Sequence, residues 1–167
     1  MQKRVQIVIE IFVALLIITG CTSSLESDLK HNKELVRLMD EEVWNKGNLE
    51  IIDELYSADF VWHFLPTGSE TVGLESLREH VRTHREAFPD WTEKIKFIVA
   101  EGDLVVINFV STGTNEGSFM GNPPTKKSIK INEMSIFRIV DDKISEQWLL
   151  PDLLSLNQQL GYSSQQN

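Results

Sequence analysis

The stretch that decides the fold begins with Phe88-Pro89-Asp90-Trp91 and ends with Lys143-Ile144-Ser145-Glu146-Gln147-Trp148 and Asp152. Between them lie Ala100-Glu101-Gly102-Asp103 and the run Gly121-Asn122-Pro123-Pro124-Thr125. This order is typical of long strands joined by one tight turn and one irregular connection. The stretch ends on an aromatic side chain and a carboxyl group, which we expect to share a pocket.

Four strands are predicted within this stretch, over residues 91–101, 104–112, 129–140 and 143–150. The first two meet at Gly102, because glycine accepts the positive φ of a tight turn. The last two meet at Asp141-Asp142. Three glycines and two prolines make the segment between the two hairpins an irregular connection.

Upstream of this stretch, apolar residues recur with the period of a helix. Leu35, Met39 and Val43 are spaced by four residues, which predicts an amphipathic helix over 32–46. The charged residues between them, including Asp40, are assigned to the solvent-facing side of that helix.

Two further helices and a strand complete the predicted fold. A short helix precedes a strand over 59–65, which carries Trp62 on one face and His63 on the other. A third helix over 74–88 ends at Pro89, which cannot continue it. Helices followed by an antiparallel meander predict an α+β fold rather than a doubly wound parallel sheet.

The first residues have the order of an export signal. A basic head at Lys3-Arg4 is followed by an apolar run and by Ile18-Thr19-Gly20-Cys21, which resembles the bacterial lipobox. The alternatives are an uncleaved anchor or a buried free thiol. Because a helix over 5–18 would measure only about 21 Å, against a hydrocarbon core of roughly 30 Å, a spanning anchor is disfavoured. We therefore expect a lipidated Cys21 and a domain held at the cell envelope, outside the cytoplasm.

The predicted organisation is a signal peptide (1–20), a polar tether (21–30), one domain (31–162) and a disordered tail (163–167). The full chain has a formal charge of −9, and removal of the signal peptide takes away two bases and one acid, which leaves −10. Such a surface repels phosphate backbones, so the charge disfavours nucleic-acid binding, and we expect no nucleic-acid partner.

Several short motifs together carry a family resemblance. FPDW, AEGD, GTxxG, GxPPTxK, FR, KIxExW and a final aspartate occur in order, and the chain over 35–161 resembles the SnoaL-like polyketide cyclase or ester cyclase family. That family belongs to the nuclear-transport-factor-2-like superfamily. The resemblance implies a cone-shaped, curved antiparallel sheet wrapped around N-terminal helices, as in cystatin-like folds. It also implies a pocket at the wide end and a sheet face often used for homodimers, but no particular reaction.

Asp152 matches the acid/base aspartate that the resemblance implies near the end of the last strand. Strict alternation from Ile144 would place Glu146 and Trp148 on one face and bring Asp152 to the same side. Beside the apolar wall of Trp148, burial would raise the pKa of the carboxyl toward a useful range. The alternative is that Asp152, which follows Pro151, caps the final helix.

Four more residues are candidates for the pocket. At His63 the resemblance implies a cavity histidine that polarises a carbonyl or moves a proton; the alternative is a strand histidine paired with a backbone carbonyl. Trp62 and Phe119 are either pocket walls for a flat apolar ligand or ordinary core. Glu133 is either a pocket acid or a solvated residue on the outer face of its strand.

His80 and His84 have the i,i+4 spacing of some metal ligands, but no partner carboxylate or HExxH pattern accompanies them. We expect them on a helix surface, and we predict no metal or cofactor. Asn115 stands where relatives commonly carry a histidine, and an amide cannot titrate.

Two functions fit these residues. The first is a cofactor-independent cyclase or isomerase-like enzyme that uses Asp152 as general acid/base with help from His63. The second is a non-catalytic lipoprotein domain whose pocket captures a small hydrophobic molecule or a protein partner.

Overall fold

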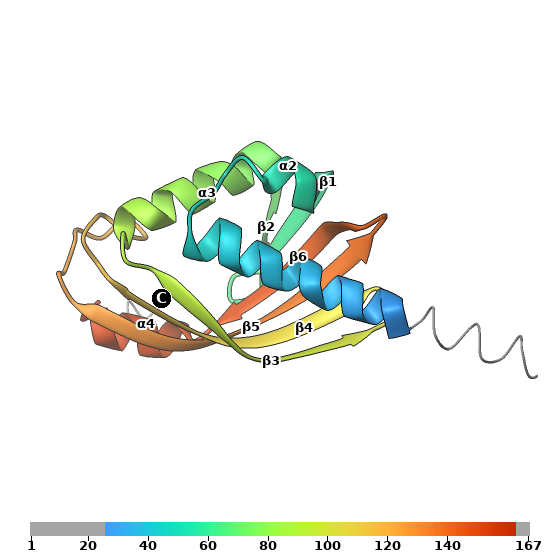
Figure 1. Cartoon of the computed structure of the whole chain (residues 1–167). Coiled ribbons are helices and arrows are strands. Elements are labelled where there is room, and N and C mark those ends of the chain that lie inside the picture. Colours follow the sequence, from blue (N-terminus) through green and yellow to red (C-terminus); the bar gives the residue numbers. More distant parts are fainter. Residues whose placement is uncertain (1–25, 163–167) are drawn as a thin grey trace, which may run out of the picture.

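The structure is a computed structural model that describes residues 26–162 (Figure 1). The predicted signal peptide, Cys21 and the predicted tail lie outside these residues. A helix over 26–39 continues into a wider π-helical turn, η1 (Asp40–Asn45). The other elements are α2 (Ile52–Leu55), β1 (Tyr56–Phe64), β2 (Ser69–Val72), α3 (Leu74–Ala87), β3 (Thr92–Glu101), β4 (Leu104–Thr114), β5 (Ser128–Val140), β6 (Lys143–Pro151) and α4 (Leu153–Leu160).

The N-terminal helix follows its apolar period. Val36, Met39 and Val43 are buried, and Gly47 ends the helical segment with a positive φ of 70°. The amphipathic helix predicted over 32–46 is therefore confirmed. It also extends upstream to residue 26 and overlaps the predicted tether, since no glycine or proline interrupts residues 26–39. Within residues 26–162, no helix is both long and apolar enough to cross a bilayer.

The six strands form one curved, open sheet in the order β2-β1-β6-β5-β4-β3 (Figure 1). The meander from β3 to β6 is antiparallel as predicted, whereas β1 pairs with β6 in parallel. The short edge strand β2 was not predicted, because its four residues Ser-Glu-Thr-Val are mostly exposed and lack an apolar alternation. Helices followed by this sheet confirm the predicted α+β class.

A bulge in β6 reverses the predicted alternation of that strand. Ile139 pairs with Ile144, but Arg138 pairs with Glu146, so Ser145 has no partner in the β5–β6 ladder. Because an extra residue moves every later side chain to the other face, Ile144 and Gln147 both point inward. The expectation that Ile144, Glu146 and Trp148 share one face is therefore wrong.

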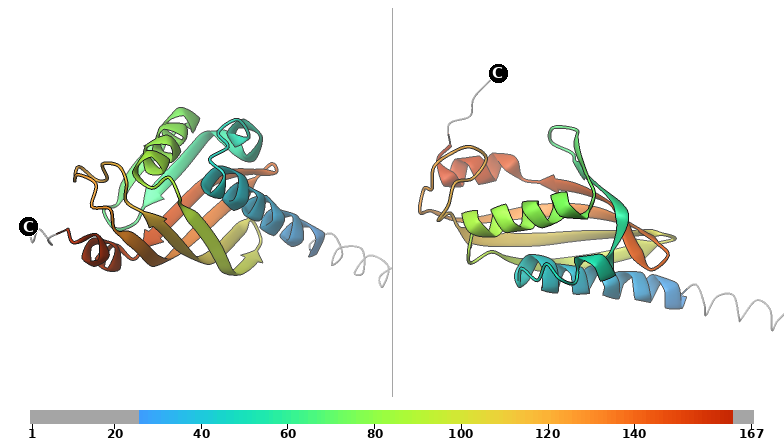
Figure 2. Two further views of the ribbon diagram at one scale, coloured as in Figure 1. Left: turned by 60° about the vertical axis from the view of Figure 1, so that its left-hand side comes forward. Right: turned by 90° about the horizontal axis from the view of Figure 1, so that it is seen from above.

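The main core lies between the concave face of the sheet and the helices above it (Figure 2). A second cluster lies beneath α4, where Leu156 and Leu160 pack with Phe88, Trp91 and Ile131. Residues of both clusters, including Trp62 from the first and Ile131 and Leu156 from the second, line the cavity that holds the candidate site.

The connection over 115–127 is irregular, as predicted, and hydrogen bonds of a buried amide side chain hold it in place. Asn115 is fully buried; it donates to the carbonyl of Gly117 at 2.8 Å and accepts from the backbone of Thr125 at 2.7 Å. The connection and α4 lie at one end of the molecule, and the N-terminal helix begins at the opposite end (Figures 1 and 2).

Candidate functional site

A cavity with two adjoining parts lies between α3 and the sheet. The outer part measures about 290 Å³ and is walled largely by apolar side chains from β1, β6, α4 and the 115–127 connection. The deep part measures about 50 Å³ and lies over β4 and β5. Both parts are lined by His80, His84, Glu133 and Leu149, so these four residues mark the junction.

Glu133 is the buried acid at this junction. It lies on the inward row of β5 between Ile131 and Ser135, and only 6% of its surface is exposed. Burial raises the pKa of Glu133 to about 7, although a hydrogen bond from the Ser111 hydroxyl works in the opposite direction. Near neutral pH this carboxyl can therefore both release and accept a proton.

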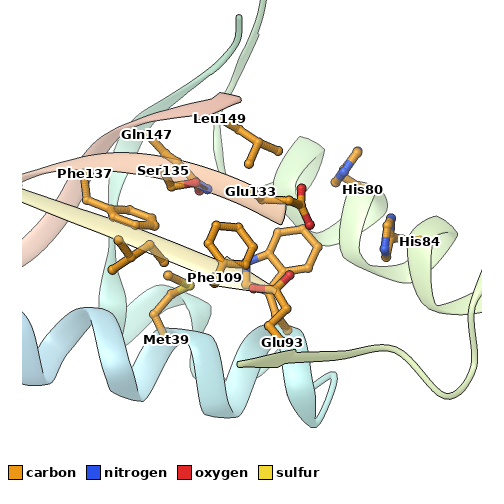
Figure 3. Close-up of a pocket in the computed structure, with 12 residues that line it drawn as sticks. Met39, His80, His84, Glu93, Phe109, Glu133, Ser135, Phe137, Gln147 and Leu149 are labelled. Atoms are coloured by element: carbon orange, nitrogen blue, oxygen red, sulfur yellow. Dashed lines mark hydrogen bonds between the residues drawn. The ribbon is translucent and has the colours of Figure 1, made fainter. Parts of the chain in front are cut away.

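His80 and His84 face Glu133 from α3 (Figure 3). The expectation that they lie on a helix surface is wrong, because one turn of α3 presents both rings to a wall of aromatic side chains. The His80 ring lies 4.0 Å from that of Trp62, and the His84 ring lies 4.2 Å from that of Trp91. Burial lowers the pKa of His80 to about 4 and that of His84 to about 3, so both rings are neutral at pH 7.

Two more carboxyl groups lie behind the deep part. The Glu93 carboxyl accepts a hydrogen bond from the Trp91 indole at 2.9 Å. Asn45 joins Glu93 to Asp40, since it accepts from the Glu93 backbone at 2.6 Å and donates to Asp40 at 3.3 Å. Burial raises the pKa of Asp40, and it raises that of Glu93 well above its usual range with help from the charges of Asp40 and Glu133.

The assignment of Asp40 to the solvent-facing side was wrong. Its buried position could have been predicted from the sequence. Asp40 lies four residues after Val36 and three before Val43, both fully buried, so helical spacing alone puts it inward. Likewise, Glu133 alternates with Ile131 on its strand. For both residues the charge of the side chain predicted an exposed position, whereas the spacing along the element correctly predicted a buried one.

Among residues 26–162, no group of three or more His, Cys, Asp or Glu side chains is arranged to hold a metal ion.

Three of the candidate pocket residues line the cavity: Trp62, Phe119 and Glu133. The Trp62 indole Nε1–H and His84 Nε2 are buried and have no hydrogen-bond partner within the described part of the chain. Both residues line the outer part of the cavity.

His63, Glu146 and Trp148 lie on the other side of the sheet. His63 Nδ1 lies 3.0 Å from Glu70 and Nε2 lies 3.2 Å from Glu146, while the His63 ring stacks on Trp148 at 4.8 Å. Arg138 donates to Glu146 at 2.9 Å, which completes a surface cluster of paired charges. The expectation that Glu146 and Trp148 line the pocket fails, because the bulge at Ser145 turns them outward.

Asp152 is exposed and caps α4. It accepts from the Ser155 backbone at 3.0 Å and from the Ser155 hydroxyl at 2.6 Å, and these bonds lower the pKa of Asp152. Neither Asp152 nor His63 lines the cavity, so the structure does not bring the two together. The structure therefore supports the alternative in which Asp152 caps the final helix.

Comparisons with known proteins agree with this architecture. The chain belongs to the SnoaL-like polyketide cyclase family, whose model matches residues 34–160. This confirms the predicted family. None of the curated proteins compared with the chain matches it.

Solved structures show the same fold. A candidate SnoaL-like polyketide cyclase from Jannaschia sp. is 24% identical with a TM-score of 0.75, and the match covers 80% of this chain and 94% of that one. IdmH, a candidate polyketide cyclase from Streptomyces antibioticus, is 30% identical with a TM-score of 0.68 and coverage of 78% and 98%. A protein with a ketosteroid isomerase-like fold from Catenulispora acidiphila is 19% identical, with a TM-score of 0.66 and coverage of 77% and 92%.

Proposed function

We propose that the cavity binds a small, flat, largely apolar carbonyl compound and that Glu133 moves a proton on it in cyclase or isomerase-like chemistry. The observation that carries the proposal is the position of Glu133, a buried carboxyl with a pKa of about 7 at the junction of an apolar cavity. A general base works best when its pKa lies near the operating pH. In this family member Glu133 takes the role that the sequence assigned to Asp152.

The proposed step balances within the cavity. The Glu133 carboxylate removes a proton from the carbon beside the carbonyl, and the C–H electron pair forms the enolate. The Trp62 indole N–H, or an N–H on His84 Nε2, donates to the enolate oxygen and stabilises its charge. In a cyclisation, the enolate carbon then attacks a second carbonyl of the same molecule, and the resulting alkoxide takes the proton from the Glu133 carboxylic acid. In an isomerisation, the enolate is conjugated with a C=C bond, and Glu133 returns the proton to the far carbon of that dienolate.

Deuterium exchange into 2-tetralone tests this proposal with a defined probe. The full-length chain in D₂O should catalyse exchange at the carbons beside the carbonyl, followed by proton NMR. Glu133→Gln keeps the shape of the side chain but cannot take a proton, so it should lower the exchange rate by at least about 100-fold. Asp152→Asn and His63→Gln serve as matched controls and should leave the rate unchanged.

The alternative is a binding domain without catalysis. It would be supported if the wild-type chain binds 2-tetralone but exchanges it no faster than buffer, or if Glu133→Gln exchanges as fast as wild type. Full loss of exchange in Asp152→Asn, with Glu133→Gln still active, would return the acid/base role to Asp152.

We further propose that Cys21 is lipidated and holds the domain at the cell envelope. The basic head, the apolar run and the lipobox-like Ile18-Thr19-Gly20-Cys21 support this proposal. Mass spectrometry of protein purified from its native host should find an acylated N-terminus at Cys21, whereas an intact Met1 would contradict it.

A further inference from the structure

The deep part of the cavity is rich in hydrogen-bond acceptors. Glu93, Glu133 and Gln147 line it together (Figure 3). Gln147 is only 4% exposed; its amide nitrogen donates to Ser135 at 3.2 Å, and its Oε1 has no partner among residues 26–162. A buried acceptor left without a donor is costly, so this position suits a ligand that brings N–H groups.

No basic side chain balances these acceptors. Within the described part of the chain, neither lysine nor arginine lines the deep or the outer part of the cavity. Asp40 adds a further carboxyl behind Glu93, and the two imidazoles are neutral. Any carboxylate formed in the deep part therefore lacks a positive partner from this part of the protein.

The walls of the deep part also suit a cation. The rings of Trp44, Phe109 and Phe137 line it beside the carboxyl groups. Aromatic faces attract positive charge when water is excluded. A volume of about 50 Å³ admits one small polar group such as an ammonium, since a water occupies about 30 Å³ in the liquid.

We propose that the deep part receives the protonated amine of the ligand, while the flat apolar body of the same ligand fills the outer part. An ammonium offers up to three N–H donors, and Glu93, Glu133 and Gln147 offer three acceptors. The proposal rests on the proposed function, because it assigns a charge to the ligand of the same cavity.

This assignment also affects Glu133. A bound cation favours the carboxylate over the carboxylic acid, so the amine of the ligand would leave Glu133 ionised and ready to accept a proton. The substrate class is then an amine that carries an enolisable carbonyl on an alicyclic or aromatic frame.

Isothermal titration of the full-length chain at pH 7.5 with 2-aminotetralin and 2-tetralol tests the proposal. The two probes share one skeleton and differ in an ammonium against a hydroxyl group. We expect 2-aminotetralin to bind at least about tenfold more tightly than 2-tetralol, because hydrogen bonds from a charged donor are stronger than those from a hydroxyl in a buried site. Equal affinities, or tighter binding of 2-tetralol, would overturn the proposal.

Two variants separate the site from the general negative charge of the chain. Glu93→Gln and Gln147→Met should each weaken the binding of 2-aminotetralin more than that of 2-tetralol, so that the ratio of the two affinities falls. The exposed control Glu101→Gln makes the same substitution at the end of β3, outside the cavity, and should keep the full preference. A preference that survives both cavity variants, or that falls equally in Glu101→Gln, would contradict the proposal.

The outcome is separable from that of the proposed function. Amine preference with no exchange of 2-tetralone would support the ligand assignment and refute catalysis by Glu133. Exchange of 2-tetralone without amine preference would support catalysis by Glu133 and refute the ligand assignment. The comparison of the two probes on the wild-type chain decides the matter even if Glu93→Gln fails to fold.

Discussion

At the scale of single residues, burial decides the chemistry of the cavity. Removal from water disfavours charge, so it raises the pKa of Glu133 and Glu93 and lowers that of His80 and His84. Near neutral pH the site therefore presents a carboxyl that can exchange its proton and two neutral rings. Asp152, which is exposed and hydrogen-bonded by Ser155, has the opposite shift.

The pKa of Glu133 sets the expected pH profile of exchange. Because the base must be ionised, the exchange rate of 2-tetralone should rise with pH through a midpoint near 7, after subtraction of the buffer rate. Ser111→Ala removes a hydrogen bond that lowers the pKa of Glu133, so its midpoint should move to higher pH. A midpoint that stays in place in Ser111→Ala would argue against Glu133 as the titrating base.

Asp152 should matter for stability and not for the cavity. Asp152→Ala removes the side-chain cap of α4 and should lower the midpoint of thermal unfolding, measured by circular dichroism. Asp152→Asn should lower it less, because asparagine also caps helices. Both variants should bind 2-tetralone as wild type does, and weaker binding in both would place Asp152 at the site after all.

At the scale of elements, helical and strand periods predicted most of the fold. The N-terminal helix, α3 and the four strands of the meander lie where the apolar spacing put them. What the period could not show is the bulge at Ser145, since the extra residue follows from pairing with β5 and β1 and not from the residues of β6. For that reason Glu146 and Trp148 face outward, whereas Trp62 on β1, which follows its strand alternation, lines the cavity as predicted.

Substitutions at two neighbouring residues of β6 test which face of the strand lines the cavity. Leu149 lines both parts of the cavity, while the next residue, Leu150, is 49% exposed on the outer face. Leu149→Trp should fill the cavity and abolish binding of 2-tetralone, measured by titration calorimetry. Leu150→Trp, the matched control, should bind normally; the reverse pattern would restore the strict alternation.

The buried histidines of α3 should make the fold sensitive to acid. His84 has a pKa of about 3 when folded, against an ordinary value of 6.5, so the unfolded chain binds its proton first. Its contribution to stability is present above pH 6.5 and declines as the pH falls toward 3. Urea unfolding at pH 7.5 and pH 5 should therefore show a smaller loss of stability in His84→Phe than in wild type, and equal losses would contradict this.

At the scale of the whole molecule, the outer face of the sheet is uncovered within residues 26–162. Phe97, Asn108, Met134 and Leu150 are successive partners across β3 to β6 and form one row on this face. Three of these four side chains are apolar and at least 42% exposed. Exposed apolar side chains that gather on one face are typical of an interaction surface.

This surface supports the expected homodimer. We propose that two copies pack through these rows, so the purified chain should sediment as a dimer in analytical ultracentrifugation. The double variant Met134→Lys, Leu150→Lys places two charges in the row and should sediment as a monomer. Val72→Lys, at an exposed site on the edge strand β2, is the control, and a wild-type monomer would refute the proposal.

The N-terminal helix and the outer part of the cavity occupy different ends of the molecule. The helix begins at one end of the molecule, whereas α4 and the 115–127 connection, which supply Leu153 and Met120 to the wall of the outer part, lie at the other (Figures 1 and 2). We propose that a lipid at Cys21 holds the N-terminal end of the molecule near the membrane and leaves the end with the outer part in the aqueous phase. A ligand would then enter from the aqueous phase rather than by lateral diffusion out of the lipid.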